Sequence, residues 1–145
     1  MAIDMAWRAE AVDETIRPED AAAIRDCLLD YFEGWFEGDA GRMDRALHPG
    51  LAKHSLGQDP DRSHALDLIT KEDLVEAASN GRGRSRDVPD RAIRIDIASV
   101  SGDIASAIAH TAVYVEYALL ARTTDGWRIT SVLWRWAEGH GPRTA

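Results

Sequence analysis

Apolar residues recur at three- and four-residue intervals in the first third of the chain, which predicts an amphipathic helix. Pro18 suits the first helical position, and Gly38 suits the residue that ends the last turn. The apolar side of this helix carries Ile24, Cys27, Leu28, Tyr31, Phe32, Trp35 and Phe36. We therefore expect a long helix whose aromatic side packs against the rest of the protein.

The next segments are shorter. Asp39 can cap a second helix that ends before His48-Pro49-Gly50, and residues 51–57 predict a short strand. Thr70 opens a third helix with a capping-box pattern. Residues 80–90 hold three arginines, two glycines and a proline, which is typical of a mobile surface loop.

From residue 91 onward, apolar and polar residues alternate with a period of two, which predicts strands. Asp125-Gly126 is a strong hairpin signal before the last strand. Because helices come first and strands afterwards, we expect an α+β fold with helices on one face of a mostly antiparallel sheet. Residues 18–138 are predicted to form a single domain, between an N-terminal arm at 1–17 and a tail at 139–145.

Net charge and composition limit the kinds of binding partner that the protein can have. The net charge of −8 disfavours nucleic acid and anionic membranes, which carry the same sign. A single cysteine excludes an internal disulfide, and the histidines lack the spacing of metal ligands, so we expect no metal and no cofactor. No apolar run reaches the roughly 18 residues of a membrane span, and residues 1–20 show no export signal. These observations predict a cytoplasmic protein.

Three segments resemble the nuclear transport factor 2-like superfamily. They are residues 30–39 (DYFEGWFEGD), Leu47-His48-Pro49 and residues 125–129 (DGWRI), although Leu47 stands where the family usually has phenylalanine. Residues 114–120 (YVEYALL) are most similar to the putative lumazine-binding branch. More distant relatives include ketosteroid isomerase-like, dehydratase-like and SnoaL-like cyclase proteins. The resemblance implies a cone-like fold with a strongly curved sheet, an internal apolar pocket for a small organic ligand, and a homodimer formed through the sheet.

The resemblance also implies candidate site residues. Tyr31 stands where isomerase-like members donate a hydrogen bond to a substrate oxygen, and the position of their general base falls on Ser55. Since serine is a poor base, neighbouring His54 is the candidate base, on a strand face shared with Ala52 and Leu56. The other candidates for ligand contacts in the pocket wall are Trp35, His110, Tyr114, Tyr117 and Trp134.

Each candidate also has a purely structural interpretation. Tyr31 suits a helix core, and either histidine suits a hydrogen-bonded structural position. Glu116 lies near the place where isomerase-like members of the family keep an acidic residue. The hairpin here is longer, which shifts that place away from Glu116, so an exposed strand carboxylate is the favoured interpretation. Strand alternation places Trp134 and Trp136 on one face of the last strand and Trp127 on the other.

Three functions are consistent with these residues. The first is binding of a small molecule in an aromatic-lined pocket. The second is a cofactor-independent isomerase, dehydratase or cyclase that uses His54 as base and Tyr31 as oxyanion donor. The third is a non-catalytic domain for oligomerisation or partner binding. The missing carboxylate base favours the first.

Overall fold

A computed structural model describes residues 15–56 and 66–142, so most of the predicted arm, the polar segment 58–64 and the end of the predicted tail lie outside the described residues. The helices are α2 (Pro18–Glu37), α3 (Ala40–Ala46), α4 (Lys71–Ser79) and the short 3-10 helix η2 (Arg84–Arg86). The strands are β1 (Leu47–Ser55), β2 (Asp67–Ile69), β3 (Arg94–Ser101), β4 (Ile104–His110), β5 (Tyr114–Thr123) and β6 (Gly126–Trp136). No helix within these residues is long and apolar enough to span a bilayer.

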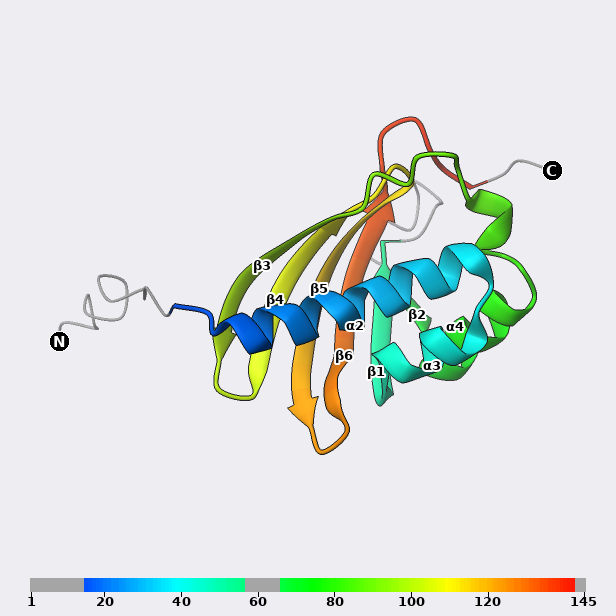
Figure 1. The fold of residues 1–145 in the computed structure, drawn as a ribbon. Coiled ribbons are helices and arrows are strands. Elements are labelled where there is room, and N and C mark those ends of the chain that lie inside the picture. Colours follow the sequence, from blue (N-terminus) through cyan, green and yellow to red (C-terminus); the bar gives the residue numbers. More distant parts are fainter. Residues whose placement is uncertain (1–14, 57–65, 143–145) are drawn as a thin grey trace, which may run out of the picture.

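The six strands form one curved sheet in the order β2-β1-β6-β5-β4-β3. Neighbouring strands are antiparallel, except that β1 runs parallel to β6. Figure 1 shows α2 lying across the concave side of the sheet, with α3 and α4 beside it over β1 and β2. The predicted α+β fold, with helices on one side of a mostly antiparallel sheet, is confirmed.

The local signals in α2 act as the sequence predicts. Pro18 occupies the first turn, and Gly38 ends the helix in a left-handed conformation with φ of 69°. The apolar side is buried, and Ile24, Leu28 and Phe32 are almost completely inaccessible. By contrast, β1 begins four residues before the predicted start, because Leu47 already pairs with Ile129 of β6.

A β-bulge in β6 changes which side chains face the helices. Leu119 of β5 pairs with Ser131 and Leu120 pairs with Ile129, so Thr130 is the extra residue. The bulge reverses the alternation along β6, and Trp127 therefore faces the same concave side as Trp134. The predicted division of the tryptophans between two faces is wrong for this reason.

Alanines form the concave side of β4, and larger residues lie on its convex side. Ala105, Ala107 and Ala109 are buried beneath α2, where small side chains allow a helix to approach the sheet closely. Ile104 is 63% exposed on the opposite face, which it shares with His110. The alternation therefore turns His110 away from the helices.

Candidate functional site

A cavity of about 890 Å³ lies between the C-terminal half of α2, helix α4, the η2 segment and the strands β1, β2, β5 and β6. Its apolar and aromatic lining comprises Trp35, Ile69, Leu74, Ala77, Tyr114, Trp134, Trp136 and Pro142. Its polar lining comprises Lys53, Ser55, Asp67, Asp73, Glu76, Asn80, Arg82, Ser85 and Arg86. This volume is within the range of typical small-molecule sites.

A buried hydrogen-bonded chain of three residues reaches the cavity at Lys53: Lys53 from β1, Tyr31 from α2 and Glu116 from β5. Lys53 Nζ donates to the Tyr31 hydroxyl at 2.5 Å, and that hydroxyl donates to Glu116 Oε1 at 2.7 Å. Lys53 Nζ also lies 3.3 Å from Glu116 Oε1. The three residues are only 7%, 2% and 3% exposed, and Lys53 is the one that lines the cavity.

Burial controls the electrostatics of this chain. Desolvation lowers the pKa of the Lys53 ammonium, and the opposing attraction of the Glu116 carboxylate does not fully compensate. Desolvation also raises the pKa of Tyr31 well above its ordinary value, and the charge and hydrogen bond of Glu116 act in the same direction. Tyr31 therefore stays a neutral phenol, while Lys53 is easier to deprotonate than an exposed lysine.

An aromatic cluster forms the adjoining wall. Trp35 Nε1 donates to the Tyr114 hydroxyl at 2.9 Å, and the Tyr114 ring lies 5.7 Å from the ring of Trp134. The Nε1 atoms of Trp134 and Trp136 are buried and have no hydrogen-bond partner within residues 15–56 and 66–142. Burial raises the pKa of Tyr114 to about 12, so its hydroxyl remains protonated. The wall thus combines flat apolar surface with indole donors.

The segment predicted as a mobile surface loop closes another side of the cavity. A Cβ on Gly83 would lie 2.1 Å from the Trp35 carbonyl oxygen, so this glycine permits backbone contact that any other residue would prevent. The guanidinium of Arg86 lies 4.5 Å from the Trp136 ring centre and donates to the Gly141 carbonyl. In the structure, this segment packs on aromatic side chains.

The cavity contains only some of the residues expected from the sequence. Trp35, Tyr114 and Trp134 line it, and Tyr31 lies behind Lys53. On β1, Lys53 and Ser55 point inward, so the predicted pocket face with His54 is wrong: His54 is on the convex side.

The remaining two candidates are also outside the cavity. His110 and Tyr117 face the convex side, where Tyr117 is 56% exposed. The preference for an exposed Glu116 is likewise wrong, because its strand places it on the concave side beside Tyr114. Lys53 is not among the residues predicted from the sequence, although a lysine between Leu51 and Ser55 on a half-buried strand is a usable signal.

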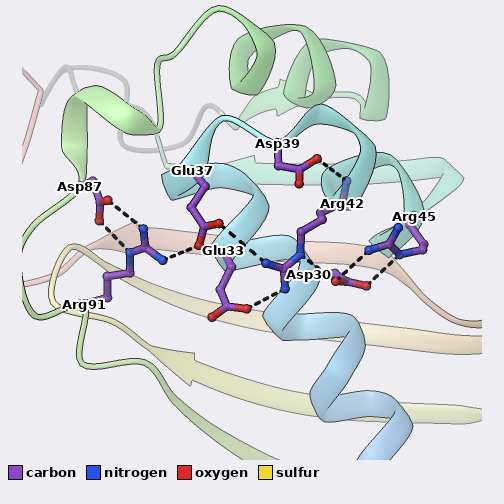
Figure 2. A network of polar contacts seen from close by, with 8 residues as sticks. All are labelled: Asp30, Glu33, Glu37, Asp39, Arg42, Arg45, Asp87 and Arg91. Atoms are coloured by element: carbon purple, nitrogen blue, oxygen red, sulfur yellow. Dashed lines mark hydrogen bonds and ion pairs between the residues drawn. The ribbon is translucent and has the colours of Figure 1, made fainter.

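The opposite, solvent-facing side of α2 carries an ionic network of half-buried and exposed side chains, shown in Figure 2. Arg42 of α3 contacts Asp30 at 3.0 Å and Glu33 at 2.6 Å. Arg45 also contacts Asp30, and Arg91 joins Glu37 to Asp87. This network ties α2 to α3 and to the segment before β3, and none of its members lines the cavity.

Within the described residues, no group of three or more histidine, cysteine or acidic side chains is arranged to hold a metal ion. Cys27 is buried beside the Ala46 carbonyl, and burial raises the pKa of its thiol to about 12. The thiol is therefore an inert core group.

Comparisons with known proteins agree with this fold. The family model described as "Putative lumazine-binding" matches residues 19–135. An NTF2-like protein of unknown function from Shewanella baltica is 20% identical, with a TM-score of 0.67 over 86% of this chain and 99% of that one. Another from Silicibacter pomeroyi is 16% identical, with a TM-score of 0.65 over 85% and 100%.

A structure from Novosphingobium aromaticivorans, described as a putative aromatic ring hydroxylase, is 14% identical, with a TM-score of 0.57 over 84% of this chain and 92% of that one. No curated protein matches the chain. At these identities the solved structures show only a shared fold, whereas the family model covers most of the chain. The chain therefore belongs to the "Putative lumazine-binding" family and has the NTF2-like fold.

Proposed function

We propose that the protein binds a small organic molecule that places a flat ring against the aromatic wall and a carbonyl or anionic oxygen beside Lys53. The observation that carries this proposal is the position of Lys53, a buried cation that lines the cavity together with the aromatic residues Trp35, Tyr114 and Trp134. Ligand sites typically combine such apolar surface with a few fixed polar groups.

Tyr31 has a positioning role in this proposal. Its proton is directed to Glu116, and its oxygen accepts from Lys53, so the hydroxyl has no second proton for a ligand. The oxyanion donor assigned to Tyr31 by resemblance is thus replaced by Lys53, which Tyr31 and Glu116 hold in place. A hydrogen bond from a charged donor contributes roughly 1.5–3 kcal/mol, about twice that of a neutral pair.

Binding is better supported than the two alternatives. An isomerase, dehydratase or cyclase with His54 as base needs that histidine in the cavity, whereas the residues of β1 that line the cavity are Lys53 and Ser55. A purely oligomerising domain would have a filled interior, whereas this interior contains a cavity of about 890 Å³.

We also propose that the convex side of the sheet forms the homodimer expected from the resemblance. A lateral row of paired residues crosses five strands there: Leu68, His54, Leu133, Tyr117 and Ile108. Leu68, Leu133 and Tyr117 are each more than half exposed, and such a contiguous apolar patch is typical of a protein interface. Leu133 lies at the middle of this row, between His54 and Tyr117.

Ligand binding is tested with 2-naphthoate, a flat probe with one carboxylate, titrated while tryptophan fluorescence is recorded. We expect quenching in the wild type and at least about tenfold weaker affinity in Lys53→Met, from the loss of one charge-assisted hydrogen bond. Lys71→Met is the matched control, because Lys71 pairs with Asp44 away from the cavity. Equal affinities for all three proteins would contradict the proposal. It would also be contradicted if freshly purified protein carries no bound small molecule in native mass spectrometry and does not bind 2-naphthoate in the titration.

The dimer is tested by sedimentation velocity of Leu133→Arg. We expect a dimeric wild type and a monomeric variant, because the new charge lies at the centre of the apolar row. Ala22→Arg, on an exposed position of α2, should leave the dimer unchanged. A monomeric wild type at high micromolar concentration would refute the proposed interface.

A further inference from the structure

The chain contains only two lysines, and they are in contrasting environments. Lys71 begins α4 and pairs with the exposed carboxylate of Asp44 at 3.2 Å. Lys53 lines the cavity, with its Nζ 5.2 Å from the ring centre of Trp134 and in contact with Tyr31. Every other basic side chain that lines the cavity is an arginine, which is not a nucleophile at neutral pH. Lys53 is therefore the single amine nucleophile of this wall.

The groups around Lys53 are those that amine chemistry on a carbonyl requires. The amine must lose a proton before it attacks, and a proton must later reach the departing oxygen. The hydrogen-bonded path from Lys53 through Tyr31 to Glu116 connects the amine to a buried acceptor over two contacts of 2.5 and 2.7 Å. Burial also favours the uncharged amine, which lowers the pKa of Lys53.

We infer that Lys53 is a site of reversible covalent attachment, where Nζ forms an imine with the aldehyde or ketone group of an aromatic ligand held in the cavity. The inference rests on the proposed function, since the ligand must first bind between the aromatic wall and Lys53. It adds a definite chemistry to that binding: a carbonyl carbon placed within bonding reach of one amine.

The reaction is balanced by groups already present. The Lys53 ammonium passes one proton through the Tyr31 hydroxyl to the Glu116 carboxylate, which leaves a neutral amine and a neutral carboxylic acid. The amine lone pair attacks the carbonyl carbon, the π electrons move to oxygen, and a nitrogen proton transfers to that oxygen to give a carbinolamine.

The second half of the reaction reverses the proton path. Glu116 returns its proton through Tyr31 to the Lys53 nitrogen, which passes it to the carbinolamine hydroxyl; the nitrogen lone pair then forms the C=N bond as the carbon–oxygen bond breaks and water leaves. The product is a protonated imine, and its positive charge faces the regenerated Glu116 carboxylate. The only reactant supplied from outside is the carbonyl ligand.

The test uses wild-type protein, 2-naphthaldehyde and sodium cyanoborohydride, which reduces the imine to a stable amine. Digestion and mass spectrometry then measure labelling at Lys53, at Lys71 and at the N-terminal amine. We expect Lys53 to be labelled at least about tenfold faster than the other two amines, because the cavity holds the aldehyde beside it. In concentrated urea the preference should vanish, which provides a control that needs no variant.

Two variants sharpen the result. Lys53→Arg should abolish the preferred label, and Glu116→Gln should slow it, because the amide cannot accept the proton. Binding is measured separately by tryptophan quenching with 2-naphthalenemethanol, which has the same ring system and no carbonyl.

If the alcohol binds and Lys53 is labelled no faster than Lys71, the imine inference is overturned and the proposed binding function stands. If the alcohol does not bind and no preferential label forms, both are contradicted. A preferential label in the folded protein that is lost in urea supports both.

Discussion

Helix α2 carries two neighbouring residues, Asp30 and Tyr31, whose polar groups have opposite surroundings. Tyr31 is 2% exposed and completes the buried chain with Lys53 and Glu116. Asp30 is half-buried and belongs to the solvent-facing ionic network of Figure 2, where Arg42 and Arg45 both contact its carboxylate. The solvent-facing side of α2 has several ion pairs, and among the described residues Lys53 and Glu116 form the one pair in which both side chains are buried.

The number of ion pairs is a poor guide to their importance. Water solvates the exposed charges whether or not they are paired, so each surface pair contributes little. A buried charge has lost its water, and removing its partner leaves it uncompensated. We therefore expect the single buried pair between Lys53 and Glu116 to dominate both stability and function.

The largest effect is expected for Glu116→Ala. This change leaves Lys53 without its carboxylate partner, so the lysine must either stay charged in a buried site or release its proton. The free energy of unfolding should fall by about 3–5 kcal/mol, measured by urea denaturation at pH 7.

The double variant Lys53→Met/Glu116→Leu separates the contribution of the ion pair to stability from that of side-chain packing. Because neither charge remains, it should be clearly more stable than Glu116→Ala and close to the wild type. It should nevertheless fail to bind 2-naphthoate with wild-type affinity. If the double variant loses as much free energy of unfolding as Lys53→Met and Glu116→Leu lose together when each is measured alone, the two residues act independently.

For Gly83→Ala we expect a smaller decrease in the free energy of unfolding, of about 1–3 kcal/mol, because overpacking displaces well-packed neighbours. The added Cβ would overlap the backbone and ring of Trp35, which then loses its hydrogen bond to Tyr114. The thermal unfolding temperature and the affinity for 2-naphthoate should both decrease. Gly141→Ala is the control, since no atom lies within 4 Å of its added Cβ.

The smallest effect is expected for Arg42→Ala in the solvent-facing ionic network. Although Arg42 contacts both Asp30 and Glu33, its loss should cost less than about 1 kcal/mol and depend on salt concentration. A loss as large as that of Glu116→Ala, in urea denaturation under identical conditions, would contradict the contrast between the two sides of α2.

The pH dependence of the network follows from Asp30. Partial burial opposes ionisation, but hydrogen bonds from Arg45 and Arg42 outweigh it and lower the pKa of Asp30 below 3.8. A carboxyl group whose pKa is lower in the folded state than in the unfolded state stabilises the protein at pH values above its unfolded-state pKa. This stabilisation is lost as the pH falls through the folded-state pKa. Asp30→Asn should therefore reduce stability at pH 7 more than at pH 2.

The sequence predicted the fold well because its signals are local. Pro18 and Gly38 bound α2, the capping box of Thr70 and Asp73 begins α4, and Asp125-Gly126 forms the last hairpin. Each of these depends on a few neighbouring residues. The predicted resemblance to the NTF2-like superfamily and its lumazine-binding branch is confirmed by the comparisons.

The site was less predictable because it depends on residues far apart in sequence and on strand bulges. Lys53, Tyr31 and Glu116 come from three elements, and only their packing shows that they meet. Alternation alone does not show which face of β1 is concave, so it favours His54, whereas Lys53 is the residue that lines the cavity. The extra residue Thr130 likewise reversed the predicted orientation of Trp127 relative to Trp134.

The central claim is that Lys53 is a buried amine in a ligand-accessible cavity. Selective 13C labelling of lysine Cε tests it directly, because the protein gives only two lysine signals and Lys53→Arg assigns them. We predict that the Lys53 signal titrates below the ordinary lysine pKa of about 10.4 and shifts when 2-naphthoate is added. A Lys53 signal that titrates at the ordinary value and does not respond to the probe would contradict the account.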